Sequence, residues 1–242
     1  MKTPGIFCAV DTPDLDGALS LVTQLRGTGV DIKLGLEFFV AEGPRGVDAV
    51  RGAVGDDVKI FLDLKLHDIP NTVAGAVRSA MRCRTDFLTL HASGGRDMMR
   101  AAVLAAAETQ DKTGIAAPKL LGVTVLTHMD AQDLEGIGIR TAPADQVDRL
   151  AGLAQSAGMN GAICAPQEIA PLRKKLGPDF YLVVPGIRPA NAAAGDQKRI
   201  MTPSAAAQLG AQYLVIGRPI TQAADPAQMA RDIFASMRAA AA

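Results

Sequence analysis

The chain has 242 residues, of which 48% are hydrophobic, and its 25 basic residues are matched by 25 acidic ones. This length and apolar content suit a single domain with a large buried core. The balanced charge gives no electrostatic basis for binding nucleic acid or a membrane surface, so local groups must hold any charged ligand. No apolar run reaches the roughly 18 residues that a membrane-spanning helix needs.

The few cysteines and histidines argue against a metal site. Cys8, Cys83 and Cys164 lie far apart without the spacing of metal ligands, and the three histidines are scattered. We therefore expect reduced thiols, which are typical of a cytoplasmic protein. No signal peptide is expected, because Met1 and Lys2 lead directly into a short apolar run that ends in a carboxylate.

Eight short apolar runs alternate with eight segments of helical pattern. The expected strands are 6–10, 31–36, 59–65, 87–91, 121–126, 161–164, 181–184 and 213–216. The expected helices are 14–26, 43–53, 71–84, 95–110, 143–157, 167–176, 203–209 and 226–238. Alternating strands and helices predict parallel β/α units, and eight units favour an α/β fold of the (β/α)8 TIM barrel type, formed by residues 1–242 as one domain.

The structural alternative is an open, doubly wound sheet. Such a sheet usually has a glycine-rich turn after its first strand, whereas the turn here, Asp11-Thr12-Pro13-Asp14, has no glycine. The alanine-rich tail at 238–242 is expected to fray.

Charged residues gather where the third expected strand ends. Asp63 and Lys65 are two residues apart and should share the face that points into the barrel. Lys33 should point inward from the neighbouring strand, and Asp68 lies just beyond, in the loop, so that Lys33, Asp63, Lys65 and Asp68 would form a row of alternating sign. The working residues of such barrels lie at these strand ends, and the alternating signs would keep a partly buried lysine protonated. The alternative is a structural ion pair together with a helix cap at Asp68.

This pattern indicates a specific chemistry. A protonated Lys65 at a strand end could act as an acid. A substrate carboxylate beside Asp63 or Asp68 would be electrostatically strained, and the loss of CO₂ would relieve that strain.

The loops after the last two expected strands predict a phosphate site. They read Pro185-Gly186-Ile187-Arg188-Pro189 and Gly217-Arg218-Pro219. Glycine lets an oxyanion approach backbone N–H groups, and arginine offers a bidentate fork. The alternative is a pair of turn glycines with solvated arginines.

Between these loops, segment 188–201 is rich in alanine and glycine. We expect it to be a lid that carries Gln197 to the phosphate, although a plain surface loop is the alternative. Weaker candidates are Asp11, for sugar hydroxyls or as a helix cap, and Thr127, for the edge of a base. His91 is expected to be a hydrogen-bonded structural histidine.

Taken together, these segments resemble the orotidine 5′-phosphate decarboxylase family over nearly the whole chain. The matching pieces are Ala9-Val10-Asp11, Lys33-Leu34-Gly35, the D-x-K-x-x-D-I-P-x-T run from Asp63 to Thr72, His91-Ala92-Ser93-Gly94-Gly95, Val123 to Thr127, Pro185-Gly186-Ile187-Arg188-Pro189, Gly195-Asp196-Gln197 and Gly217-Arg218-Pro219.

The resemblance implies an enzyme that forms UMP in pyrimidine synthesis with no metal or other cofactor. It implies that Lys65 protonates C6 of the pyrimidine as CO₂ leaves, with Asp63 beside the substrate carboxylate. Asp11 and Lys33 would hold the ribose, and Thr127 would contact the base.

The resemblance also implies which residues bind the phosphate of the substrate and that a second subunit takes part in the site. The residues implied around the 5′-phosphate are Pro185, Arg188, Gln197, Gly217 and Arg218. Asp68 and Thr72 would reach the neighbouring subunit's site, which implies a homodimer. His128 stands where relatives often have serine, and this affects only the detail of the base contact.

Two other functions remain as alternatives. A magnesium-dependent 3-keto-gulonate 6-phosphate decarboxylase shares the D-x-K-x-x-D strand end. A catalytically silent protein that binds a phosphate ligand would keep only the phosphate loops. The Gly-Ile-Arg-Pro and Gly-Asp-Gln segments favour the nucleotide enzyme.

Overall fold

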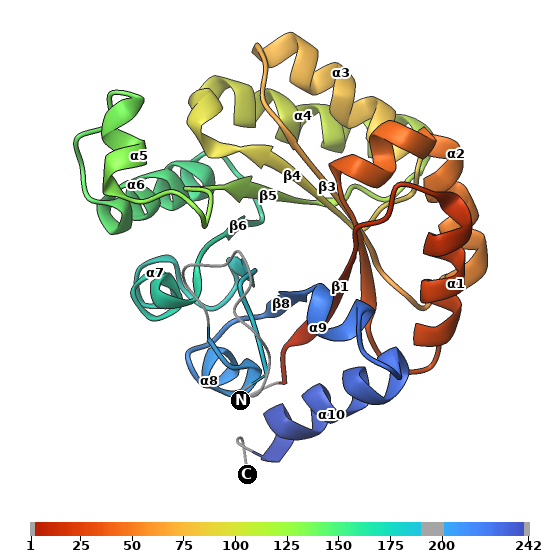
Figure 1. The fold of residues 1–242 in the computed structure, drawn as a ribbon. Helices are drawn as coiled ribbons and strands as arrows, with labels where there is room; N and C mark the ends of the chain where they lie inside the picture. Colours follow the sequence, from red (N-terminus) through yellow and green to blue (C-terminus); the bar gives the residue numbers. More distant parts are fainter. Residues whose placement is uncertain (1–2, 190–200, 240–242) are drawn as a thin grey trace.

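The computed structural model describes residues 3–189 and 201–239. Eight parallel strands close into a barrel in chain order, and β8 pairs with β1 (Figure 1). The strands are β1 (Gly5–Val10), β2 (Asp31–Leu34), β3 (Ile60–Leu66), β4 (Phe87–His91), β5 (Lys119–Val123), β6 (Gly161–Ile163), β7 (Tyr181–Val184) and β8 (Tyr213–Ile216). The predicted TIM barrel is therefore confirmed, and the open sheet is wrong because the strands form a closed ring.

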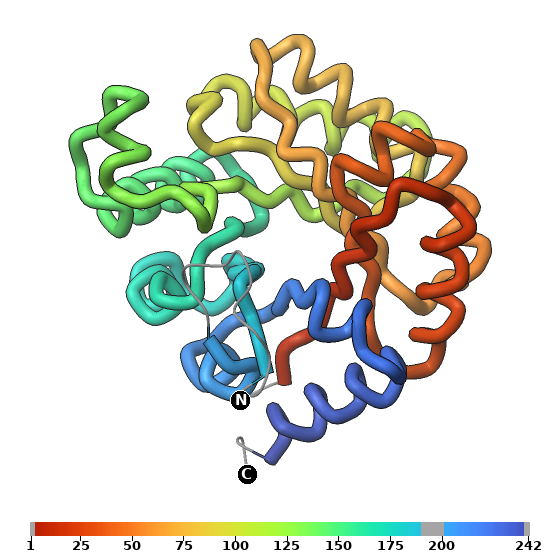
Figure 2. The backbone as a smooth tube through the Cα atoms, viewed as in Figure 1, coloured from red at the N-terminus to blue at the C-terminus, as the bar shows by residue number. Residues whose placement is uncertain are grey.

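Helices form a ring outside the barrel. They are α1 (Leu15–Leu25), α2 (Leu36–Val54), α3 (Pro70–Met81), α4 (Gly95–Thr113), α5 (Ala131–Gly136), α6 (Pro143–Ser156), α7 (Ile169–Leu176), α8 (Pro203–Gln208), α9 (Arg218–Thr221) and α10 (Pro226–Ala239), with short 3₁₀ turns η1 (Ala92–Gly94) and η2 (Pro166–Glu168). The tube in Figure 2 winds once around the barrel and brings the first strand beside the last. None of the described helices is long and apolar enough to cross a membrane.

Apart from shifts of a few residues at helix ends, four of the described helices differ from the prediction. Helix α2 begins at Leu36 rather than at 43, because its first turns precede a kink at Gly43, where φ is 60°. The short helices α5 and α9 were not predicted, since neither is long enough to show an apolar period. Helix α10 continues to Ala239, so the tail expected at 238–242 starts as helix, and residues 240–242 lie outside the described part.

Aromatic side chains fill the half of the barrel at the N-terminal ends of the strands. Phe7, Phe61 and Phe87 are buried early in β1, β3 and β4, and the ring centroids of Phe7 lie 5.1 Å from those of the other two. Tyr181 and Tyr213 pack against this cluster from β7 and β8. This plug closes the N-terminal half of the barrel, so the space for a ligand lies at the C-terminal ends of the strands.

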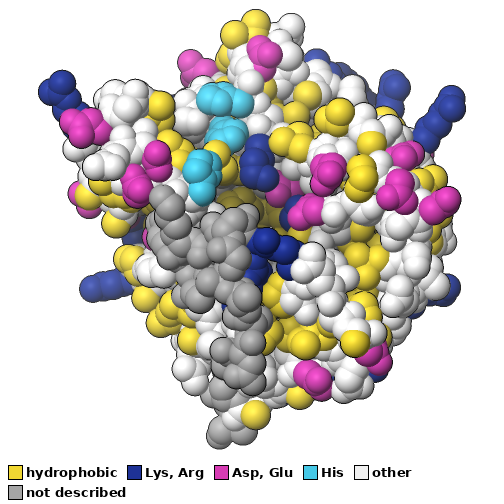
Figure 3. Space-filling model, viewed as in Figure 1, with side chains coloured by type: hydrophobic (Ala, Val, Ile, Leu, Met, Phe, Trp, Pro, Cys, Tyr) yellow, Lys and Arg dark blue, Asp and Glu magenta, His cyan; other side chains and the backbone are white. Residues whose placement is uncertain are grey.

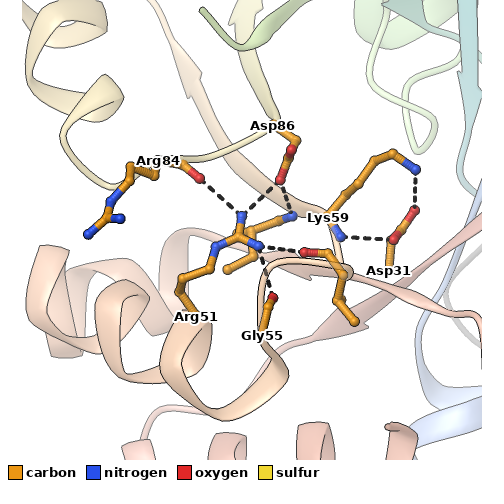
Figure 4. A network of polar contacts seen from close by, with 8 residues as sticks. Asp31, Arg51, Gly55, Lys59, Arg84 and Asp86 are labelled. Carbon is orange, nitrogen blue, oxygen red and sulfur yellow. Dashed lines mark hydrogen bonds and ion pairs between the residues drawn. The ribbon is translucent and has the colours of Figure 1, made fainter. Parts of the chain in front are cut away.

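A polar network fixes the starts of the strands at the N-terminal face (Figure 4). Arg51 of α2 donates to the carboxylate of Asp86 at 2.8 Å, and the same carboxylate accepts the backbone N–H of Ile60 at 2.8 Å. The carboxylate of Asp31 accepts the backbone N–H of Lys59 at 2.9 Å and lies 3.4 Å from its Nζ. These bonds join the beginnings of β2, β3 and β4, and so align the strand ends that carry the charged residues.

Candidate active site

Four charged side chains form a row across the C-terminal ends of β1, β2 and β3. Nζ of Lys33 lies 3.3 Å from Oδ1 of Asp11 and 3.6 Å from Oδ2 of Asp63. Nζ of Lys65 lies 2.8 Å from the same Oδ2 of Asp63. The row therefore reads Asp11, Lys33, Asp63 and Lys65. The predicted alternation of Lys33, Asp63 and Lys65 is confirmed, and the addition of Asp11 was missed, although its strand neighbours that of Lys33.

Burial and charge act on Asp63 in opposite directions. Its burial disfavours the ionised carboxylate, but the ammonium groups of Lys33 and Lys65 and the hydrogen bonds from Lys65 and Thr89 hold its pKa below the ordinary value. Asp63 is therefore an anion at neutral pH and balances the lysines beside it. Both lysines line the cavity, but the side chain of Lys65 is 30% exposed against 9% for Lys33, so the amine of Lys65 is the more open of the two to a ligand.

The backbone around Lys65 departs from a regular strand. Leu62 pairs with Leu88 and Leu66 pairs with Leu90, so the intervening stretch of β3 is longer than that of β4. Lys65 itself has a φ of 50°, which is uncommon for a residue with a side chain. The expected shared face of Asp63 and Lys65 is confirmed, since both side chains line one cavity and meet at 2.8 Å, but the shift in register was not predicted. Such strained residues cluster at functional sites.

A threonine of β4 that the sequence reasoning missed holds this irregular stretch. The hydroxyl of Thr89 donates to Oδ1 of Asp63 at 2.8 Å and accepts the backbone N–H of Lys65 at 2.9 Å. In the sequence, Thr89 looks like an ordinary β-branched strand residue. The one available signal is that it lies two residues before His91, and therefore on the same face of the strand.

The charged row lines one side of a cavity of about 560 Å³ at the C-terminal ends of the strands. Its floor is apolar and includes Phe61, Ile163 and Val215, and Thr127 lies in its wall. Figure 3 looks onto this face and shows Lys and Arg side chains gathered around a hollow near its centre, with histidines beside them. A volume in this range suits a small ligand such as a mononucleotide.

Two arginines mark the part of the cavity that follows β7 and β8. Pro185, Gly186 and Arg188 line it after β7, and Gly217 and Arg218 line it after β8. Gly186 has a φ of 78°, a conformation that favours glycine. Burial, followed by repulsion from Arg218, lowers the pKa of the Arg188 guanidinium. Two mutually repelling guanidinium groups at a cavity wall suit a phosphate dianion.

The expected lid lies mostly outside the described part of the chain. This holds for Gln197 and for residues 190–200 of the predicted segment 188–201. Its two ends are described and meet in a short parallel bridge, where the backbone N–H of Arg188 donates to the carbonyl of Met201 at 3.0 Å. The role of the lid and of Gln197 stays a prediction.

Asp68 and Thr72 lie outside the cavity. Both are exposed at the start of α3, and the carboxylate of Asp68 accepts the backbone N–H of Ile69 at 2.6 Å. The predicted row of Lys33, Asp63, Lys65 and Asp68 is therefore wrong at its last member within one chain, because Asp68 lies in the exposed loop beyond the end of β3.

The histidines cluster beside Lys65. The rings of His67 and His91 lie 5.2 Å apart, and burial together with His67 and Lys65 lowers the pKa of His91. His128 is exposed. In the described ranges, 3–189 and 201–239, no group of three or more His, Cys, Asp or Glu side chains is arranged to hold a metal ion.

Comparisons with known proteins agree on one family. A family model described as "Orotidine 5'-phosphate decarboxylase / HUMPS family" matches residues 4–233. The orotidine 5′-phosphate decarboxylase of Paramagnetospirillum magneticum is 50% identical over 232 residues, which cover 96% of this chain and 97% of the relative. The enzyme of the same name from Idiomarina loihiensis is 50% identical over 98% of this chain and 99% of its own length.

A solved structure shows the same fold. The crystal structure of orotidine 5′-phosphate decarboxylase from Lactobacillus acidophilus matches with a TM-score of 0.85 and 34% identity, covering 98% of this chain and 99% of that one. With the match of the family model over nearly the whole length, the chain belongs to the orotidine 5′-phosphate decarboxylase / HUMPS family.

Proposed function

We propose that the chain converts orotidine 5′-phosphate to UMP and CO₂ without a metal or other cofactor. The observation that carries this proposal is the amine of Lys65, 2.8 Å from the buried carboxylate of Asp63 at the rim of the cavity. The bond from C6 to the carboxylate breaks, CO₂ leaves, and the electron pair left on C6 takes a proton from the Lys65 ammonium. Solvent then returns a proton to the partly exposed amine.

The two sides of the cavity have different tasks in this reaction. Asp63 lies beside the substrate carboxylate and repels it, while the Lys65 ammonium stabilises the charge that develops at C6. Charges that are already in place before the reaction are often the largest catalytic contribution. Asp11 and Lys33 hold the ribose, and Thr127 contacts the base.

The phosphate is bound far from the reacting carbon. Its ligands are Pro185, Arg188, Gln197, Gly217 and Arg218. Their binding energy can offset the cost of placing the substrate carboxylate beside Asp63.

An ultraviolet assay of orotidine 5′-phosphate in EDTA tests the function. Full turnover in the chelator is expected. No turnover of orotidine 5′-phosphate, together with decarboxylation of 3-keto-gulonate 6-phosphate that EDTA removes and magnesium restores, would instead favour the 3-keto-gulonate 6-phosphate decarboxylase alternative. Binding of UMP without any turnover would favour the silent phosphate-binding protein.

Arg218→Ala is expected to raise KM for orotidine 5′-phosphate by roughly 10- to 100-fold, because a charge-assisted contact with the phosphate is lost. Steady-state kinetics measure this change. Arg231→Ala is the control, since Arg231 is an exposed arginine of α10 that bonds Gln228 away from the cavity. An unchanged KM in Arg218→Ala would count against a phosphate role.

We also propose that the enzyme works as a homodimer. Leu36, Val40 and Ile69 are large apolar side chains that are 50%, 81% and 67% exposed. Leu36 and Val40 lie in the first turns of α2, after β2, and Ile69 lies directly before α3, after β3, between the exposed residues Asp68 and Thr72 in the sequence. Exposed apolar groups gathered on one rim are typical of an interaction surface. A second copy that covers them would bring Asp68 and Thr72 to its own cavity.

Mixing two inactive variants tests this composite site. Lys65→Ala and Asp68→Asn are each expected to be nearly inactive. After subunit exchange at equal amounts, roughly a quarter of all sites would combine an intact Lys65 with an intact Asp68. Recovery of activity on mixing is therefore expected. No recovery, with exchange shown by differently tagged subunits, would mean that Asp68 serves its own chain.

We further propose that the enzyme resides in the cytoplasm. Cys8, Cys83 and Cys164 are all buried free thiols, which suits a reducing compartment. Recovery of the activity in the cytoplasmic fraction of cells is expected, and its recovery from a secreted fraction would contradict the assignment.

A further inference from the structure

Thr89 is hydrogen-bonded to both Asp63 and Lys65, the two charged residues on which the proposed reaction depends. It lies in the middle of β4 and is 0% exposed. Its hydroxyl donates to Oδ1 of Asp63 at 2.8 Å, while Oδ2 of that carboxylate contacts Nζ of Lys65 at 2.8 Å and lies 3.6 Å from Nζ of Lys33. The hydroxyl therefore fixes the carboxylate oxygen that the lysines leave free. A carboxylate held at both oxygens has a defined orientation.

The same hydroxyl also fixes the backbone of Lys65. It accepts the N–H of Lys65 at 2.9 Å, in the stretch where the β3–β4 register shifts between Leu62 and Leu66. In a regular pair of strands a main-chain carbonyl would accept such an N–H. Here the side chain of Thr89 takes that place, beside a residue with a φ of 50°. A strained conformation persists only where its surroundings hold it.

The hydroxyl of Thr89 therefore bonds both Asp63, the anion, and the backbone of Lys65, the proposed acid. A rotation of Asp63 would change its distance to both lysines, and a relaxation of the Lys65 backbone would move the origin of its side chain. Thr89 is too deeply buried to touch a ligand and does not line the cavity. Its effect on the reaction must pass through the two residues that it bonds.

We infer that Thr89 is a positioning residue, which orients Asp63 and the backbone of Lys65 so that the Lys65 ammonium faces the reacting carbon. This inference rests on the proposed decarboxylation. It assigns to the hydroxyl an effect on kcat rather than on the binding of the nucleotide.

The test compares three variants in the orotidine 5′-phosphate assay. Thr89→Val keeps the shape but loses the hydroxyl, and Thr89→Ser keeps the hydroxyl but loses the methyl group. Thr28→Val is the matched control. Thr28 is also buried, and its hydroxyl also donates one bond, to the carbonyl of Leu25 at 2.6 Å, and accepts one backbone N–H, from Val30 at 3.4 Å. It lies between α1 and β2, away from the cavity.

Thr89→Val is expected to lower kcat by roughly 10- to 100-fold, the scale of a lost hydrogen bond to a charged group, while UMP affinity stays within about 3-fold of the wild type. Thr89→Ser should recover most of the rate. Thr28→Val should keep the wild-type kcat, although its thermal stability should fall by about as much as that of Thr89→Val.

The inference is overturned if kcat of Thr89→Val stays within about twofold of the wild type. It is also overturned if Thr89→Ser is as slow as Thr89→Val, or if kcat in Thr28→Val falls as far. If Thr89→Val does not fold, Thr89→Cys replaces it, since a thiol of similar shape is only a weak donor and acceptor; a wild-type rate in that variant would overturn the inference. A wild-type chain that leaves orotidine 5′-phosphate unchanged would refute the proposed function instead.

Discussion

Lys65→Ala is expected to reduce kcat/KM for orotidine 5′-phosphate by at least about 10⁴-fold, because one group supplies both the proton and the charge that stabilises C6. Lys65 is the only member of the charged row that is both cationic and open to the cavity by nearly a third of its side chain. Lys33 cannot replace it, since its amine is held between Asp11 and Asp63. Steady-state kinetics at high enzyme concentration measure the loss.

Lys59→Ala is the matched control for this variant. Lys59 directly precedes β3, the same strand, but lies at its opposite end, where it pairs with Asp31 at 3.4 Å. It should retain wild-type kinetics. The circular dichroism of Lys65→Ala should remain native, because Asp63 keeps Lys33 and Thr89 as partners. If Lys65→Ala kept more than a few per cent of kcat, Lys65 would not be the acid.

Asp63→Asn is expected to damage both stability and activity. The change removes the carboxylate that contacts both Lys33 and Lys65, whose ammonium groups would then repel each other in a largely buried site. Breaking a buried ion pair on one side costs about 3 kcal/mol of the free energy of unfolding. The activity should fall with it, because Lys65 loses the carboxylate that holds its amine in position.

Chemical denaturation measures the loss in the free energy of unfolding of Asp63→Asn, with Asp148→Asn as the control variant. Asp148 pairs with Lys175 at 2.6 Å, but both side chains are about half exposed, at 48% and 47%. Loss of this surface pair is expected to cost less than about 1 kcal/mol. Equal losses in the two variants would contradict the structural role of Asp63.

The difference in the free energy of unfolding between the wild type and Asp63→Asn should depend on pH, because the pKa of Asp63 is lowered in the folded chain. Its carboxylate binds protons less readily in the folded than in the unfolded chain, where the pKa is about 3.9. The stability that it contributes is therefore fully present above about pH 5 and is lost as the pH falls through the folded value. Denaturation curves should show a constant gap between the wild type and Asp63→Asn above that pH and a narrowing gap below it. A gap that widened in acid would contradict the assignment.

The barrel and much of the charged row could be predicted from the sequence. Alternating apolar runs and helical segments determine a parallel barrel, because each unit repeats the same pairing with its neighbour. The i, i+2 spacing of Asp63 and Lys65 predicts a shared face. These two signals depend on local periodicity, which a single sequence displays directly.

The irregular features could not be predicted in the same way. The register shift beside Lys65 depends on how β3 pairs with β4, and no local pattern in Asp63-Leu64-Lys65 signals it. Thr89 contributes through its hydroxyl contacts across that pair of strands. The early start of α2 depends on a kink at Gly43 that reads as a helix boundary in sequence.

A crystal structure with UMP bound tests the central claim most directly. The phosphate should lie against Gly217 and Arg218, and Nζ of Lys65 should approach C6 to within roughly 3 Å, the reach of a proton transfer. A bound UMP whose C6 faced away from Lys65, with the amine turned into bulk solvent, would contradict the proposed mechanism.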